Sequence, residues 1–147
     1  MRLPIIPPQP PTASARVANK TDARRAITGC LNFLIRNVTR NTVLGDAILR
    51  ADTSATRRTG LLKHTSLEPG HGLWIVPCQG IHMFFMKFAL DLVYVSRAKH
   101  VKKVVRAIQP WRISLCLTAH SVLELPVGTI DRTGIVPGDV LEVTKNL

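Results

Sequence analysis

Chemically versatile side chains are concentrated in the stretch PCQGIHMFFMKFALD, which runs from Pro77 to Asp91. It holds a cysteine, a histidine and an aspartate, together with two methionines and two adjacent phenylalanines. A thiol beside an imidazole can act in nucleophilic catalysis or bind a metal, and a carboxylate can serve as an acid, a base or a ligand. The stretch therefore has two possible roles: a chemical site, or the buried interior of the protein.

Cys78 and His82 have the spacing Cys-x-x-x-His. In a strand they would lie about 13 Å apart, too far for a hydrogen bond, and Pro77 and Gly80 disfavour a helix that would bring them within one turn. A dyad between Cys78 and a distant histidine stays open. A structural zinc needs four ligands, usually in closely spaced pairs. The other histidines are scattered along the chain: His64, His71, His100 and His120. We therefore predict no metal site, no catalytic residue in this stretch and no cofactor.

Two carboxylates stand in apolar surroundings, Asp91 before the run LVYV and Glu124 inside LELP. The structural explanation is that Asp91 caps backbone amides at the start of a strand, and that Glu124 faces solvent or pairs with a basic neighbour. We favour this explanation for both. Both still belong to the candidate ligand-binding residues, which are Trp74, Cys78, His82, Asp91, Trp111 and Glu124.

The sulfur and aromatic side chains of the stretch are expected to fill a core; they are Met83, Phe84, Phe85 and Met86. The alternative is a soft, aromatic-lined pocket for a small apolar or planar ligand, with Trp74 and Trp111 in its wall. Trp111 lies between a proline and an arginine, which places it near the surface.

Positive charge is the strongest signal in the composition, since 20 lysines and arginines face 9 acids, a net charge of +11. No acid occurs from Leu92 to Leu123. A basic folded domain favours an anionic partner, which would be nucleic acid, an acidic lipid or an acidic protein, and a general solubility charge is the alternative. No RNP motif, Gly-rich phosphate loop or zinc finger is present. The candidate anion-binding residues are Arg97, Lys99, Lys102, Lys103, Arg106 and Arg112.

The length of 147 residues and the hydrophobic fraction of 46% predict one domain with a sizeable core. Residues 1–22 form a Pro-rich stretch expected to be a flexible tail, and residues 23–147 the globular domain. Prolines interrupt the apolar start, and no apolar run approaches the roughly 20 residues of a membrane helix, so we predict a cytoplasmic protein. Cys30, Cys78 and Cys116 are expected to be reduced thiols.

Apolar runs separated by turn residues predict strands over 30–37, 42–51, 73–77, 78–86, 90–97, 101–108, 121–128 and 139–143, with an antiparallel meander from 78 to 108. A short helix is expected to begin at Asp52, Thr53 or Ser54 and to end near Gly60, and a helical turn to end at Gly134. The expected fold class is α+β and mostly β, a compact barrel-like antiparallel or mixed sheet with one or two short helices.

The segments TRRTGLL, GLWIVPC…IHMFFMKFALDLVYV and SVLELPVGTIDRTGIVPGDVLEV resemble the bacterial and archaeal family called domain of unknown function 192, over about Leu44 to Val143. The resemblance implies a compact, barrel-like α+β domain and no established activity. Many members look exported and begin with a signal segment, from which the Pro-rich start of this chain departs.

Three hypotheses follow from the sequence. The first is a noncatalytic accessory or binding domain with an anionic partner. The second is an enzyme or small-ligand protein with a pocket near Cys78, His82 and Asp91. The third is a module recruited to a partner through the proline-rich PPQPP segment.

Overall fold

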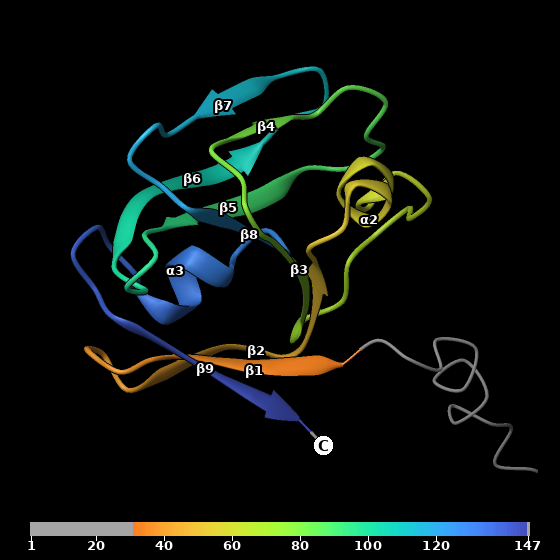
Figure 1. The fold of residues 1–147 in the computed structure, drawn as a ribbon. Coiled ribbons are helices and arrows are strands. Elements are labelled where there is room, and N and C mark those ends of the chain that lie inside the picture. Colours follow the sequence, from red (N-terminus) through yellow and green to blue (C-terminus); the bar gives the residue numbers. More distant parts are fainter. Residues whose placement is uncertain (1–30, 147) are drawn as a thin grey trace, which may run out of the picture.

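The computed structural model describes residues 31–146, in which β-branched and apolar runs form nine strands and two short helices (Figure 1). Most strands belong to one sheet: β1 (Asn32–Asn37), β2 (Thr42–Ala51), β3 (His71–Ile75), β5 (Leu90–Val95), β6 (Val101–Ile108), β8 (Ser121–Leu125) and β9 (Leu141–Asn146). A separate ribbon and the helices complete the fold: β4 (Gly80–His82), β7 (Ile113–Leu115), α2 (Ser54–Thr59) and α3 (Thr129–Thr133). The expected tail over 1–22 and Cys30 lie outside the described residues.

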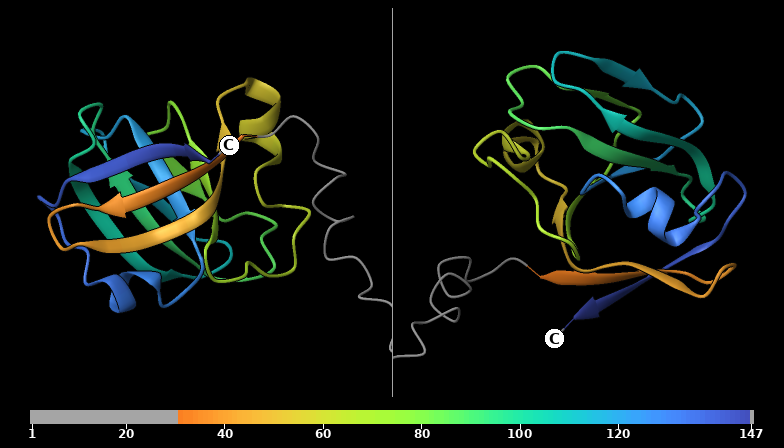
Figure 2. Two further views of the ribbon diagram at one scale, coloured as in Figure 1. Left: turned by 90° about the horizontal axis from the view of Figure 1, so that it is seen from below. Right: turned by 180° about the vertical axis from the view of Figure 1, so that it is seen from behind.

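The seven-stranded sheet has the order β6-β5-β8-β3-β2-β1-β9. The β2–β3 pair is parallel and the other pairs are antiparallel. The sheet curves until its two edges approach one another, but it does not close (Figure 2). His100 forms an isolated bridge with Val140, and the Val101 amide donates to the Asp139 carbonyl at 2.8 Å. The mostly-β, barrel-like α+β fold expected from the sequence is confirmed.

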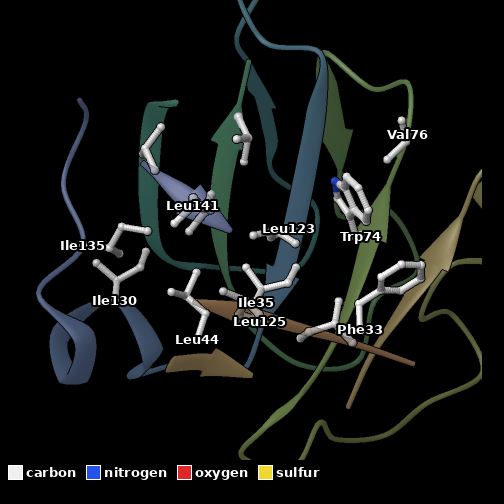
Figure 3. Close-up of a cluster of buried hydrophobic side chains, with 14 residues drawn as sticks. Phe33, Ile35, Leu44, Trp74, Val76, Leu123, Leu125, Ile130, Ile135 and Leu141 are labelled. Carbon is white, nitrogen blue, oxygen red and sulfur yellow. The ribbon is translucent and has the colours of Figure 1, made fainter. Parts of the chain in front are cut away.

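The concave side of the sheet encloses one hydrophobic core, drawn from strands at both edges and from α3 (Figure 3). Phe33 on β1 meets Trp74 on β3 edge to face, with ring centroids 5.7 Å apart. Ile130 brings α3 into this core and is fully buried. We call this cluster the inner core.

The convex side carries a second cluster, the outer core, in which Leu92, Tyr94 and Val122 are fully buried. The β4–β7 ribbon and the α2 region cover this face, contributing Ile81 from β4 and Leu61 just after α2. Because both faces of β5 and β8 are covered, every residue of these two strands is buried.

Local signals set the helix ends where the sequence predicted them. Thr53 is the N-cap of α2 and forms a capping box with Thr56, whose amide donates to the Thr53 hydroxyl at 3.1 Å. Gly60 follows the last turn of α2. Gly134 ends α3 with φ of 64°, in the left-handed region that glycine enters most readily.

The stretch from Pro77 to Asp91 corrects two predictions. The expected strand over 78–86 is limited to Gly80–His82, because a turn at Phe85, with φ of 63°, follows it. Met83 and Met86 are buried as expected, whereas Phe85 is 71% exposed and fills no core.

The predicted meander holds for β5 and β6, which form an antiparallel hairpin, but β4 pairs with β7 instead of β5. β8 takes the other side of β5. None of the helices within residues 31–146 has the length and apolar character to cross a membrane.

Candidate functional site

A cavity of about 600 Å³ opens where α2 faces the ends of β3 and β8 and the ribbon strand β4. Its apolar wall comes from the outer core and includes Leu61, Ile75, Ile81 and Met86. Its polar wall consists of Ser54, Arg57, Thr59, Cys78, His82 and Glu124. An apolar cavity with a few convergent polar groups is the usual form of a small-molecule site.

Glu124 is the last residue but one of β8, opposite Leu73 on β3 and Leu92 on β5. The residue is only 7% exposed, yet its carboxyl lines the cavity. None of the described side chains forms a hydrogen bond or an ion pair with this carboxyl. Burial raises the pKa of Glu124 to about 7, because the charged form is poorly solvated there. The expectation that Glu124 faces solvent or pairs with a cation is therefore wrong.

Arg57 is held at the cavity by the backbone around α2. One of its terminal nitrogens, Nη1, donates to the Asp52 carbonyl at 2.7 Å and to the Val76 carbonyl at 3.2 Å. These two carbonyls follow the ends of β2 and β3, so the guanidinium links the two parallel strands. Among the side chains that the structure describes, no carboxylate forms an ion pair with Arg57.

Cys78 is near enough to Arg57 and Glu124 for both charges to act on its thiol. Its Sγ donates to the Gly80 carbonyl at 3.1 Å. Burial is the largest effect on the thiol and raises its pKa; the negative charge of Glu124 acts in the same direction, while the Gly80 hydrogen bond and the charge of Arg57 oppose the rise. The thiol is therefore less acidic than a free cysteine, which is the opposite of an activated nucleophile.

His82 ends β4 at the mouth of the cavity, where it is exposed. Its ring stacks on Phe84 with centroids 5.0 Å apart. The structure thus brings three of the six candidate ligand-binding residues to one cavity: Cys78, His82 and Glu124.

The other three candidates lie elsewhere. Asp91 accepts hydrogen bonds from the amides of Ala107 at 2.9 Å, Gly128 at 3.1 Å and Ile130 at 2.9 Å. It caps backbone amides as expected, but they belong to segments distant in the sequence and not to its neighbours. Trp74 belongs to the inner core. Trp111 is 59% exposed, in keeping with its expected place near the surface.

The cations of the tract from Leu92 to Leu123 do not form one uniform surface. Val104 packs on the inner core and Val105 on the outer core, so alternate residues of β6 point to opposite faces. Arg106 pairs with Asp131 beside α3 at 2.8 Å, whereas Lys103 donates to the Leu115 carbonyl of the ribbon at 2.9 Å. The remaining members are distributed along the same hairpin and its flanks: Arg97, Lys99, Lys102 and Arg112.

Metal-binding residue types do not gather in the part of the chain that is described. No group of three or more histidine, cysteine, aspartate or glutamate side chains within residues 31–146 could hold a metal ion.

A family model described as Uncharacterized ACR, the domain of unknown function 192, matches residues 37–143. The chain belongs to this family. A UPF0127 protein from Thermococcus sibiricus is 29% identical over 115 residues, which cover 74% of this chain and 73% of the relative.

Two solved structures share the fold of this domain of unknown function 192. One is a proposed transcription regulator from Sinorhizobium meliloti 1021, with a TM-score of 0.67 and 21% identity, covering 78% of this chain and 93% of that chain. The other is a protein of unknown function from Novosphingobium aromaticivorans DSM 12444, with a TM-score of 0.67 and 23% identity, covering 79% and 88%.

In this member of the domain of unknown function 192 family, sequence reasoning missed three polar residues of the cavity wall, Ser54, Thr59 and Arg57. Arg57 is the charged residue among them. The segment TRRTGLL, which contributes to the family resemblance, contains it and also supplies Gly60 and Leu61 to the cavity wall. The signal was therefore present, but an arginine in a basic chain does not stand out by residue type.

Proposed function

We propose that this domain binds a small molecule in the cavity between α2, β3, β4 and β8, without transforming it. The observation that carries the proposal is the Glu124 carboxyl, which is buried, lines the cavity and has no hydrogen-bond partner among the described residues. A carboxyl that is largely removed from water and has no partner costs free energy, because it is poorly solvated. A ligand that hydrogen-bonds to this carboxyl would remove that cost.

The two polar groups at the site define the end of the ligand that they would recognise. Nη1 of Arg57 donates to the Asp52 and Val76 carbonyls, and Nη2 donates to the Ser54 hydroxyl at 3.4 Å. A guanidinium has five N–H donors, so Arg57 can still donate to an acceptor oxygen of a ligand. Glu124 can accept from an N–H or O–H group, and when protonated it can also donate. A primary amide or a carboxylic acid fits both, since each carries an acceptor beside a donor. An apolar body would pack on Leu61, Ile75 and Met86.

The state of Cys78 supports binding rather than catalysis. Nucleophilic catalysis by cysteine uses the thiolate, and burial raises the pKa of this thiol. Its Sγ already donates to the Gly80 carbonyl, so the thiol is fixed as part of the wall.

The proposal is tested by titrating ¹⁵N-labelled protein with short carboxylic acids, primary amides and amines while recording two-dimensional NMR spectra. Acids or amides are expected to shift amide signals around Cys78, His82 and Met86. Glu124→Gln and Arg57→Gln should each weaken that binding at least tenfold, and Arg106→Gln, on the far side of the sheet, should not. Shifts confined to residues outside the cavity, or equal binding by all three variants, would contradict the site.

We also propose a second function, an interaction with an anionic partner. It is favoured by the run from Leu92 to Leu123, which holds six lysines and arginines and no acid, in a chain of net charge +11. Replacing Lys102, Lys103 and Arg112 by glutamine should reduce binding to heparin or to a single-stranded oligonucleotide and flatten its salt dependence. Unchanged retention of that variant on heparin would count against it.

A further inference from the structure

A row of exposed apolar side chains crosses the β4–β7 ribbon and its turns. We call it the apolar ridge, and it consists of Phe85, Trp111, Ile113, Leu115 and Leu117. These residues are between 59% (Trp111) and 76% (Leu117) exposed. Large apolar residues scattered singly are normal on protein surfaces, whereas a contiguous group of them marks an interaction site.

Hydrogen bonds and ring contacts hold the ridge in place. The Trp111 amide donates to the Met83 carbonyl at 2.9 Å, and the Met83 amide donates to the Arg112 carbonyl at 2.8 Å. The rings of Phe85 and Trp111 then meet edge to face with centroids 4.9 Å apart. Ser114 of β7 is buried, so its neighbours Ile113 and Leu115 point outward. The ridge is therefore formed before any partner arrives.

Backbone geometry at the two aromatic turns supports a role outside the core. Phe85 has φ of 63° and Trp111 has φ of 67°, both in the left-handed region that is unfavourable for bulky residues. Such conformations persist where the surrounding structure imposes them, and they are concentrated at binding sites. Here they present two aromatic rings to solvent, where the rings add little to the stability of the fold.

The segment that carries the ridge is strongly basic. Residues 69–123 contain seven lysines and arginines and a single acid, Asp91, which is 1% exposed and occupied by backbone amides. Arg112 lies within the ridge, and Lys103 reaches it through the Leu115 carbonyl at 2.9 Å. This surface would attract an anionic partner and oppose a second copy of the chain, whose net charge is also +11.

We propose that the apolar ridge docks on the surface of an anionic lipid bilayer. Tryptophan and phenylalanine are suited to the headgroup region, and leucine and isoleucine to the outer part of the acyl chains. Arg112 and Lys103 would bind the lipid phosphates and carboxylates. The inference deepens the proposed anionic partner and rests on it.

The shape of the ribbon favours a membrane over a folded protein. The ribbon lies at one end of the molecule, away from β1, β2 and β9, and projects from the outer face of the sheet (Figures 1 and 2). A projecting row of side chains can enter a fluid interface to a shallow depth along its whole length. His82 at the mouth of the cavity stacks on Phe84, whose ring centroid lies 5.8 Å from that of Trp111. The mouth of the cavity is therefore beside the ridge, and would be beside the lipid.

The test uses the full chain with vesicles of phosphatidylcholine alone and of phosphatidylcholine with phosphatidylserine in equal parts. The wild type should co-sediment with the anionic vesicles. The triple variant Phe85→Ser, Trp111→Ser, Leu117→Ser should bind them at least tenfold more weakly. The matched control replaces three exposed valines outside the ridge by serine and should bind as the wild type does: Val38, Val43 and Val127.

A second measurement does not depend on the folding of the triple variant. The chain has two tryptophans, so Trp74→Phe leaves Trp111 as the single fluorescent reporter. Its emission should shift to shorter wavelength with anionic vesicles. Three results would contradict the docking of the ridge on lipid. They are unchanged emission at saturating vesicle concentration, equal binding by the triple variant, and binding to an oligonucleotide with none to vesicles. If the protein bound neither vesicles, oligonucleotide nor heparin, the proposal of an anionic partner would also be contradicted.

Discussion

Glu124 and Asp139 are both buried carboxyls, but their surroundings differ in kind. Asp139 accepts hydrogen bonds from Asn37 Nδ2 at 2.8 Å, from Arg40 Nε at 2.7 Å and from the Val136 amide at 3.1 Å. Burial alone would raise the pKa of Asp139, and these hydrogen bonds and the charge of Arg40 outweigh it, so that the pKa is lowered. Glu124 has no such partners, and its pKa rises to about 7. Asp139 therefore has a structural role, whereas Glu124 is available to a ligand.

The raised pKa of Glu124 predicts the direction in which pH changes stability. A carboxyl whose pKa is about 7 in the folded state and 4.5 in the unfolded chain takes up a proton on folding between these two pH values. The stability that this protonation contributes is complete below pH 4.5 and is lost as the pH rises through about 7. The free energy of unfolding falls by at most roughly 3 kcal/mol over this range. Glu124→Gln does not titrate, so its free energy of unfolding should fall less than that of the wild type over this range.

Urea denaturation of the two proteins between about pH 5 and pH 8 measures this difference. Because every other group is shared, the difference between the curves isolates Glu124. Parallel curves would show that the carboxyl titrates normally, and the argument that it lacks a partner would then fail.

Asp91 shows how one side chain fixes the relation between elements. It lies on β5, and its oxygens bind the amide of Ala107 on β6 and the amides of Gly128 and Ile130 at the start of α3. Asp91→Ala leaves three amides without their acceptor, so we expect a loss of about 3 kcal/mol or more in the free energy of unfolding.

Asp131→Ala is the matched control for that variant. Asp131 belongs to α3, pairs with Arg106 and has a side chain that is 72% exposed, so its loss should cost about 1 kcal/mol or less. Chemical denaturation measures both. Equal losses would mean that Asp91 contributes only a surface charge.

Sequence patterns predicted the elements whose signals are local. The capping residue Thr53 and the left-handed Gly134 decide helix ends within one turn, and the structure has them as predicted. Glu124 shows what local sequence patterns cannot predict. The alternation in β8 places it on the face opposite Leu123 and Leu125, and that face would be solvated in a single-layered sheet. The ribbon and the α2 region cover it, and no short-range pattern reveals a second layer.

Dependence on long-range contacts also explains why the candidate site could be predicted only in part. Cys78 and His82 were chosen by residue type and do line the cavity, but Arg57 reaches it only because parallel pairing of β2 with β3 brings the Asp52 and Val76 carbonyls together. Residue type alone predicts a core position for Phe85, because aromatic residues usually are buried. Its exposure depends on the turn that ends β4, which the sequence run IHMFFM conceals.

β1, the first strand of the described residues, connects segments from the two ends of the sequence. β1 lies between β2 and β9, pairing with the chain's last strand over Asn32 to Asn37. Phe33 and Ile35 extend from it into the inner core. The described residues thus form a continuous sheet with a core on each face, whose integrity depends on contacts between segments distant in the sequence.

From this arrangement we predict that residues 23–147 fold alone. The shortened chain should unfold in one cooperative transition with the same midpoint as the full chain, because β1 and everything after it are retained. Removing residues 1–38 instead deletes β1, separates β9 from β2 and takes Phe33 and Ile35 from the inner core, so that chain should lose cooperative unfolding. Calorimetry and circular dichroism of the three chains measure this. A lower midpoint for residues 23–147 would show that the first 22 residues contribute to the core, and the domain boundary would have to move toward the N-terminus.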